Sequence, residues 1–346
     1  MNDLVFFYPD GHERHYEIGH PERPERVEAI KSALEEFGYW QVYPRLEPDK
    51  ISKDVLWAIH TPEYLSALEE ICERGMHFDA DTYTTPASWD LALNSAGGAI
   101  AIARAVWLGE AQRGFALTRP PGHHATSQRA MGFCLLNNIA LAAENLIQEQ
   151  GARRLAIIDL DLHHGNGTQD IFFSRGDVFY LSTHQYPHYP GTGWLNETGN
   201  GPGEMRSANF PLPPFSGDRE FSTVMDELII PLLNRYQPEM ILVSYGFDPH
   251  FDDPLGSLQL TSGGYGKLIK QLALWADENC QGRISLFLEG GYDLKAARAC
   301  SAAVVAALLG ENFPERYDQS LSPVDHGESS TFTSILEQTK LLWELT

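Results

Sequence analysis

The segment 159–167 (DLDLHHGNG) holds two carboxylates and an imidazole at a spacing that lets them act together. It follows the apolar run LAII, which is typical of a buried strand. Alternate residues of a strand lie on one face, so Asp159, Asp161 and His163 are expected to point the same way. Burying such groups at the end of a strand costs solvation free energy, and a divalent metal ion is the simplest way to offset that cost. A second strand-end aspartate, Asp248, makes a chance acidic loop the poorer interpretation.

Asp161, His163 and Asp248 are the predicted metal ligands. Three protein ligands and one open position are typical of catalytic zinc, which lowers the pKa of bound water and polarises a carbonyl group. Two carboxylates and one imidazole also suit Fe(II), Mn or Co, so the residues favour zinc without fixing the metal.

Two adjacent histidines, His123 and His124, lie in 119–125 (RPPGHHA), where proline and glycine favour a rigid loop. Adjacent histidines cannot easily bind one face of a metal, so acid–base catalysis is predicted for them. Each then needs a partner on its other ring nitrogen, and Asp159 and Asn166 are the candidates. A carboxylate partner raises the proton affinity of an imidazole more than an amide does, so the two histidines should differ in charge.

Tyr292, which follows two glycines in the motif EGGY, is a candidate donor to the oxyanion of a tetrahedral intermediate. Gly132, Phe133 and Tyr189 are interpreted as walls of a narrow entrance that suits a thin apolar chain. Core packing is the alternative for Phe133, and packing at a strand end for Tyr292. Cys134 is interpreted as a small buried hydrophobe. The chain has no G-x-S-x-G motif, no P-loop and no dinucleotide-binding fingerprint.

Helical periodicity alternates with short apolar runs, which favours an α/β domain with a mostly parallel central sheet and helices on both faces. Helices are predicted at 23–37, 62–73, 88–108, 137–150, 218–236, 262–279 and 295–309. Strands are predicted at 114–118, 155–160, 178–183, 240–245 and 284–289. One catalytic domain is expected over 1–310, with 311–346 as a tail that packs on it or extends from it and ends in a short helix near 335–345.

Chemically distinctive residues follow each predicted strand. In open α/β sheets, ligands bind beyond the carboxyl ends of the strands. The sequence therefore predicts one site built from five strand ends, which carry His123 with His124, Asp161 with His163, His184, Asp248, and 290–292 (GGY).

The composition limits the classes of partner and compartment. With 25 Lys and Arg against 47 Asp and Glu, the net charge is −22, and no basic patch for nucleic acid is evident. An acidic surface favours the approach of cationic substrates, but an ordinary cytosolic surface explains the charge equally well. Four cysteines without a C-x-x-C pair indicate a reducing compartment. The amino terminus lacks a signal-peptide pattern and no apolar stretch is long enough to span a membrane, so a cytoplasmic protein without a membrane partner is expected.

These motifs resemble those of the zinc-dependent histone deacetylase superfamily, which includes acetylpolyamine amidohydrolases and bacterial deacetylase-like amidohydrolases. The resemblance extends from about Tyr8 to about Leu309. It looks most like the class II branch, because Asn166 stands where class I members carry aspartate. The matching segments are RPPGHHA (119–125), GFC (132–134), DLDLHHGNGTQ (159–169), GFD (246–248) with DPLG (253–256), and EGGY (289–292).

The resemblance implies an arginase-like α/β fold, one catalytic Zn²⁺ and hydrolysis of an N-acyl amine. It also implies structural K⁺ or Na⁺ ions, and an arginine, Arg26, in an internal pocket that handles acetate. The implied catalytic roles are zinc binding by Asp161, His163 and Asp248, a His123–Asp159 pair, His124 as general base and acid, a carbonyl contact from Gly132, and polarisation of the acyl carbonyl by Tyr292. The implied cation ligands are Asp159, Ser182 and the carbonyl groups of Asp161, His163 and Thr183, with Phe172 and Val178 at a second site.

Acyl-lysine is predicted to be a better substrate than an acetylated polyamine, the alternative. The polyamine-specific branch carries glutamate where this chain has Leu255, and Asp81 is predicted to hold a peptide backbone at the rim. A binuclear manganese ureohydrolase is less favoured, because Asn166 and His250 are neutral where bridging carboxylates are needed. A non-catalytic acyl-lysine binder is the remaining alternative, although no group required for turnover is missing.

Overall fold

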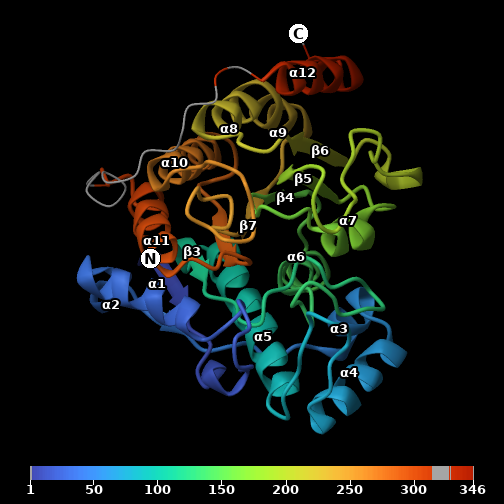
Figure 1. The fold of residues 1–346 in the computed structure, drawn as a ribbon, viewed down its shortest axis with the longest axis vertical. Helices are drawn as coiled ribbons and strands as arrows, with labels where there is room; N and C mark the ends of the chain where they lie inside the picture. Colours follow the sequence, from blue (N-terminus) through green and yellow to red (C-terminus); the bar gives the residue numbers. More distant parts are fainter. Residues whose placement is uncertain (1, 314–326, 328, 346) are drawn as a thin grey trace.

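The computed structural model describes residues 2–313, 327 and 329–345. Within these residues one sheet of eight strands runs in the order β2-β1-β3-β8-β7-β4-β5-β6, and every neighbouring pair is parallel (Figure 1). The strands are β1 (Asn2–Phe7), β2 (Arg45–Leu46), β3 (Ala111–Ala116), β4 (Leu155–Asp159), β5 (Val178–Gln185), β6 (Ser207–Leu212), β7 (Met240–Tyr245) and β8 (Ile284–Leu288).

The strands bury both of their faces, so they consist of nearly continuous apolar residues. In β4, Ala156 and Ile158 point into one hydrophobic core, whereas Leu155 and Ile157 point into the other. This alternation divides the helices into two layers. One layer contains α1 (Glu25–Glu36), α8 (Asp218–Val224), α9 (Ile230–Tyr236), α10 (Ser262–Asn279), α11 (Leu294–Leu308) and α12 (Ser330–Trp343). The other contains α3 (Lys53–Ile59), α4 (Pro62–Arg74), α5 (Ser88–Trp107), α6 (Asn138–Gln148) and α7 (Asn166–Phe172).

Each helix and strand predicted from periodicity has a counterpart within a few residues, and the predicted α/β architecture is confirmed. The helix predicted at 218–236 contains one π-helical segment, Met225–Ile229, between α8 and α9. Short elements were not predicted: α2 (Tyr39–Val42), α3, α7, the 3₁₀ turns His12–Arg14 and Gly201–Gly203, and the strands β1, β2 and β6. β6 contains Pro211, which is tolerated because β6 is an edge strand.

The carboxyl ends of β4, β7 and β8 meet at one edge of the sheet, where the parallel pairing of β4 with β7 and of β7 with β8 brings their following loops together. At the far end of the sheet order, α12 packs on the edge strand β6 and buries Phe332 and Trp343 (Figure 1). No described helix is both long and apolar enough to cross a membrane.

Candidate metal centre and active site

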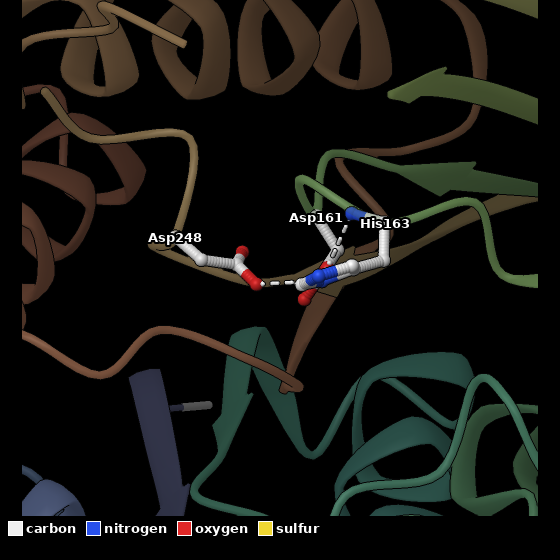
Figure 2. A group of neighbouring side chains, drawn as sticks. All are labelled: Asp161, His163 and Asp248. Atoms are coloured by element: carbon white, nitrogen blue, oxygen red, sulfur yellow. Dashed lines mark hydrogen bonds and ion pairs between the residues drawn. The ribbon is translucent and has the colours of Figure 1, made fainter. Parts of the chain in front are cut away.

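Asp161, His163 and Asp248 lie together at the carboxyl edge of the sheet (Figure 2). Asp161 and His163 follow β4, and Asp248 follows its neighbour β7. His163 Nδ1 lies 3.2 Å from Asp161 Oδ1 and 3.1 Å from Asp248 Oδ2. All three side chains are buried, and one ligand atom from each lies within 4.8 Å of the others.

The surroundings of this triad fit a divalent metal ion. Burial and the neighbouring charge of Asp161 raise the pKa of Asp248 to about 7, although His163 acts in the opposite direction. The backbone N–H of Gly290 donates to Asp161 Oδ2 over 2.8 Å, and that of Leu162 donates to Asp248 Oδ1 over 3.1 Å, so both carboxylates are oriented. A Cβ atom at Gly290 would collide with Asp248 Oδ2, so only glycine leaves the carboxylates their room. Two carboxylate oxygens and an imidazole nitrogen are ligands that zinc accepts.

The loop after β3 brings His123 and His124 next to the triad with different partners. His123 Nδ1 lies 3.1 Å from Asp159 Oδ2, and His124 Nδ1 lies 2.8 Å from Asn166 Oδ1. The two rings are 4.1 Å apart between centroids, and the ring of His124 is 5.8 Å from that of His163. Each histidine therefore lies beside one of the two candidate partners, His123 beside Asp159 and His124 beside Asn166.

These partners separate the two histidines electrically. Burial acts to lower the pKa of His123, but Asp161 and Asp159 outweigh it and raise that pKa to about 10. His124 is equally buried, and the positive charges of His123 and His163 add to the effect, so its pKa lies well below the ordinary value. One histidine thus holds a proton while its neighbour is free to accept one.

Glu289 anchors the histidine loop, a role that the sequence did not assign to it. Its Oε2 accepts the backbone N–H groups of Gly122 over 2.7 Å and His123 over 3.0 Å. Its Oε1 accepts the hydroxyl of Ser244 over 3.1 Å. A glutamate that directly follows an apolar strand was the available signal, because a carboxylate there must find buried donors.

Tyr292 is held at the same edge by its backbone. Its N–H donates to Asp253 Oδ2 over 2.6 Å, and its ring meets the edge of Phe133 at 5.8 Å. Gly132 and Phe133 both have positive φ, 56° and 70°, and a Cβ atom at Gly132 would collide with the ring of His124. Glycine is therefore required where this turn approaches His124.

Aromatic side chains line the approach to these groups. Tyr189 is 43% exposed, and its ring lies 5.2 Å from that of His124 and 6.1 Å from that of His163. Another ring that the sequence did not single out, His188, lies 5.2 Å from His163. Phe133 contacts His20 as well as Tyr292, so the ring walls come from several loops.

The two other predicted rim residues occupy different environments. Leu255 is half-buried in the loop after Asp253, whose Oδ1 accepts its N–H over 3.0 Å. Asp81 is exposed, and its carbonyl group lies 3.0 Å from His20 Nε2. The adjacent Thr82 accepts the N–H of Phe133 over 3.3 Å, which links this loop to the entrance.

Arg26 lies behind Tyr292 in a fully buried charge network, with its guanidinium 5.0 Å from the ring centroid. It donates to the carbonyl groups of Glu289 and Gly291, and its Nη1 lies 2.9 Å from Glu22 Oε1. Glu22 also accepts from Arg119 Nε over 2.8 Å. Burial acts to raise the pKa of Glu22, but Arg119 and Arg26 outweigh it and lower that pKa to about 2. Sequence reasoning missed Glu22, although it shares the segment PERPER with Arg26.

The residues suggested for a monovalent cation come together around Asp159. Asp159 and Ser182 are register partners of β4 and β5, and Thr183 Oγ1 donates to the Asp159 carbonyl over 3.4 Å. Tyr180, which was not predicted, donates to Asp159 Oδ2 over 3.0 Å. The second pair, Phe172 and Val178, lies apart, at the end of α7 and the start of β5.

His184 is a correction to the set of strand-end residues. It lies inside β5 rather than after it, because that strand continues to Gln185. Its Nδ1 lies 2.9 Å from Ser182 Oγ and its Nε2 lies 2.9 Å from the Gly193 carbonyl. His184 therefore supports the neighbouring loop instead of facing the triad.

A family model, the histone deacetylase domain, matches residues 20–308. The chain belongs to the histone deacetylase family. This deacetylase is 42% identical over 306 residues to a probable deacetylase of Archaeoglobus fulgidus, and the alignment covers 86% of this chain and 85% of that protein. It is 36% identical over 295 residues to a histone deacetylase-like amidohydrolase of Pseudomonas aeruginosa, and the alignment covers 84% of this chain and 77% of that protein.

The crystal structure of the HDA15 HD domain superposes on this deacetylase with a TM-score of 0.89 and 32% identity, covering 99% of this chain and 94% of that one. The arginase/deacetylase-like fold and the resemblance found in the motifs are both confirmed. The family and the names of these relatives establish a hydrolase that acts on amide bonds.

Proposed function

We propose that this deacetylase is zinc-dependent and removes acetyl or other short acyl groups from lysine side chains. The observation that carries the proposal is the buried triad of Asp161, His163 and Asp248 beside two histidines with opposite protonation preferences. The triad offers a metal site, and the histidine pair offers a proton acceptor next to a fixed positive charge.

Zinc held by Asp161, His163 and Asp248 would act as a Lewis acid toward the acyl carbonyl and the attacking water. His124, neutral and with Nδ1 held by Asn166, accepts the proton of that water at Nε2 and later gives a proton to the leaving amine. His123 stays protonated beside Asp159 and contributes positive charge.

Tyr292 and Gly132 bind the substrate amide in this proposal. Burial raises the pKa of Tyr292 well above its ordinary value, so the hydroxyl keeps its proton and donates a hydrogen bond to the developing oxyanion. The carbonyl group of Gly132 accepts the amide N–H. Arg26, close behind Tyr292, is the proposed contact for the released acetate.

A monovalent cation, K⁺ or Na⁺, is also proposed at the back of the site. Its binding next to β4 would fix the backbone carbonyl groups of Asp161 and His163, whose side chains are proposed zinc ligands. The proposed ligands are Asp159, Ser182 and the carbonyl groups of Asp161, His163 and Thr183, with the carbonyl groups of Phe172 and Val178 at a second position.

The choice of lysine over polyamine rests on the mouth of the site. A polyamine brings further ammonium groups, which a selective site would meet with a carboxylate, whereas this mouth presents the half-buried Leu255. Asp81 directly precedes Thr82, whose hydroxyl accepts the N–H of Phe133 at the entrance. From this position the Asp81 carboxylate can accept backbone N–H groups of a peptide. The net charge of −22 favours polycations in general, which makes the acetylpolyamine the alternative substrate.

The test compares kcat/KM for an acetyl-lysine peptide and for N8-acetylspermidine at one ionic strength. We expect the peptide to be preferred, and Leu255→Glu to shift the ratio toward the spermidine derivative. Leu255→Gln is the matched control, because it has the same length as the glutamate but no charge. A clear preference of the unaltered chain for acetylspermidine would overturn the choice of lysine.

The same preparation tests the metal and the remaining alternatives. One zinc per chain and activity that a chelator removes are expected. Two metal ions per chain would favour the binuclear ureohydrolase. Binding of the acetyl-lysine peptide without turnover would instead favour a non-catalytic module.

A further inference from the structure

A cavity of about 550 Å³ opens at the amino ends of β4, β5 and β6, the edge of the sheet opposite the metal triad. Arg154 directly precedes β4, whereas Asp161 follows the same strand at its other end. The cavity is therefore separate from the catalytic site. Its lining consists of Arg154, Gly176, Phe179, Met205, Arg206, Leu232, Arg235, Tyr236, Leu342, Trp343 and Glu344.

Three arginines give this cavity a charge opposite to that of the chain as a whole. The net charge of the protein is −22, yet Glu344 is the one carboxylate residue in the lining beside Arg154, Arg206 and Arg235. Within the described part of the chain, none of the three forms an ion pair with a carboxylate. The lining thus holds more guanidinium groups than carboxylates, although Asp177 and Glu239 also act on Tyr236 from outside the lining.

The three guanidinium groups bond to backbone carbonyl groups and keep donors to spare. Arg154 Nε donates to Gln237 over 3.0 Å, and Arg206 Nη1 donates to Met205 over 2.9 Å. Arg235 Nη1 donates to the Trp343 carbonyl over 2.8 Å. Arg206 Nε is buried and has no hydrogen-bond partner among the described residues. A buried charged donor without a partner is costly, so an acceptor from outside the chain would be stabilised there.

Aromatic rings form the other wall. The guanidinium of Arg206 lies 5.2 Å from the ring centroid of Tyr236, whose ring is 5.2 Å from that of Phe179. Phe179 in turn lies 5.7 Å from Trp343 of α12. Arg235 also bonds to the end of α12, and Leu342, Trp343 and Glu344 at that end form part of the lining.

We propose that this cavity binds a small organic phosphate, with the phosphate group on the three arginines and a flat apolar part beside Tyr236. Guanidinium groups bind phosphate oxygens through paired, charge-assisted hydrogen bonds. The volume lies within the range of small-molecule sites. Inorganic phosphate shares the anionic part of this chemistry, so the test separates the two.

The test uses the full chain and isothermal titration calorimetry with adenosine 5′-monophosphate, inorganic phosphate and adenosine at one ionic strength. We expect the monophosphate to bind more tightly than inorganic phosphate, and adenosine to bind least. Arg206→Gln should weaken monophosphate binding by about tenfold or more. Arg153→Gln is the matched control, because Arg153 is the exposed neighbour of Arg154 and lies outside the lining.

Absence of heat with either phosphate probe at millimolar concentration would overturn the proposal. So would equal losses in Arg206→Gln and Arg153→Gln. Equal affinity for the monophosphate and inorganic phosphate would overturn the part assigned to the aromatic wall. If Arg206→Gln does not fold, Arg154→Gln replaces it, because Arg154 is exposed. Deacetylase activity should be unchanged in Arg154→Gln, so this test is independent of the catalytic proposal.

Discussion

Two neighbouring clusters of buried charged side chains compensate for the lost hydration of their carboxylates in different ways. Around Glu22, one carboxylate meets the guanidinium groups of Arg26 and Arg119, and its pKa falls to about 2. In the triad, Asp161 and Asp248 share one imidazole, and the pKa of Asp248 rises to about 7. In the first cluster two positive groups face one carboxylate, whereas in the second Asp248 has another carboxylate, Asp161, as its neighbour and shares His163 with it.

This difference separates a cluster that stabilises the fold from one that suits a bound metal ion. A buried carboxylate that has lost its hydration must be paired, and the Glu22 cluster is complete without any other partner. In the triad, burial and repulsion from Asp161 oppose the negative charge of Asp248, and a bound cation would relieve that repulsion. Two carboxylates close to one imidazole at a strand edge are therefore the feature that suits a metal ion, and the substitutions below can break or sharpen the contrast.

The largest effect is expected for Asp248→Ala. Removing one of three ligands should abolish both zinc binding and deacetylation, because the remaining two ligands no longer define the site. Metal analysis and kcat/KM are the measurements. Asp252→Ala is the control, since Asp252 is exposed and only four residues away. One full equivalent of zinc in Asp248→Ala would show that the ligand assignment is wrong.

The second effect concerns the histidine pair. His124→Ala should lower kcat by about 100- to 10,000-fold, the usual contribution of a general base. His123→Ala should be milder, because His123 supplies charge instead of moving a proton. Steady-state kinetics of both variants at equal zinc content provide the comparison. Similar modest losses in the two variants would remove the division of roles.

Tyr292→Phe comes third. Loss of a single donor to the oxyanion typically costs about 100- to 1,000-fold in kcat, and KM should change much less. Tyr16→Phe is a suitable control, because Tyr16 lines the same 220 Å³ cavity as Tyr292 but is 46% exposed. An unchanged kcat in Tyr292→Phe would exclude the hydroxyl from the mechanism.

The smallest effect on turnover is expected for Glu22→Gln, which acts on stability. Two buried guanidinium groups lose their carboxylate, a change that costs about 3–5 kcal/mol in comparable cases. The folded pKa of about 2 lies below the ordinary value of 4.5, so the stabilisation by Glu22 is present above pH 4.5 and is lost as the pH falls toward 2.

Urea denaturation at several pH values measures this effect. The free energy of unfolding of the unaltered chain should fall more steeply between pH 4.5 and 2 than that of Glu22→Gln. The control is Glu25→Gln, because Glu25 is exposed on the same segment. Identical pH dependence in Glu22→Gln and the unaltered chain would show that the charge network is not what holds this loop.

Local sequence patterns predicted the long elements well, because periodicity depends on neighbours in the chain. The strands β1 and β6 were not predicted, and part of the reason lies in their own residues. β1 begins with two polar residues, Asn2 and Asp3, and β6 contains a proline that argues against a central strand. Their place in the sheet depends on partners far along the sequence, which no local pattern reveals.

The same distinction applies to the site. The triad could be anticipated because Asp161 and His163 share one strand end and the motif of Asp248 follows another. Glu22 and Arg119 are 97 residues apart, and Glu289 and Gly122 are 167 apart, so their contacts are a product of the fold. Sequence analysis thus identified the residues suited to chemistry better than the residues that hold them in place.

The position of β8 has a consequence for the order in which this enzyme is made. β8 is the last strand along the chain, yet it lies between β3 and β7 and joins the two parts of the sheet. The segment that directly follows β8 carries Glu289, which accepts backbone N–H groups of the histidine loop, and Gly290, which donates to Asp161. The groups that hold both the histidine loop and Asp161 in place are therefore among the last to be synthesised, and a chain that ends before β8 lacks them together with Tyr292.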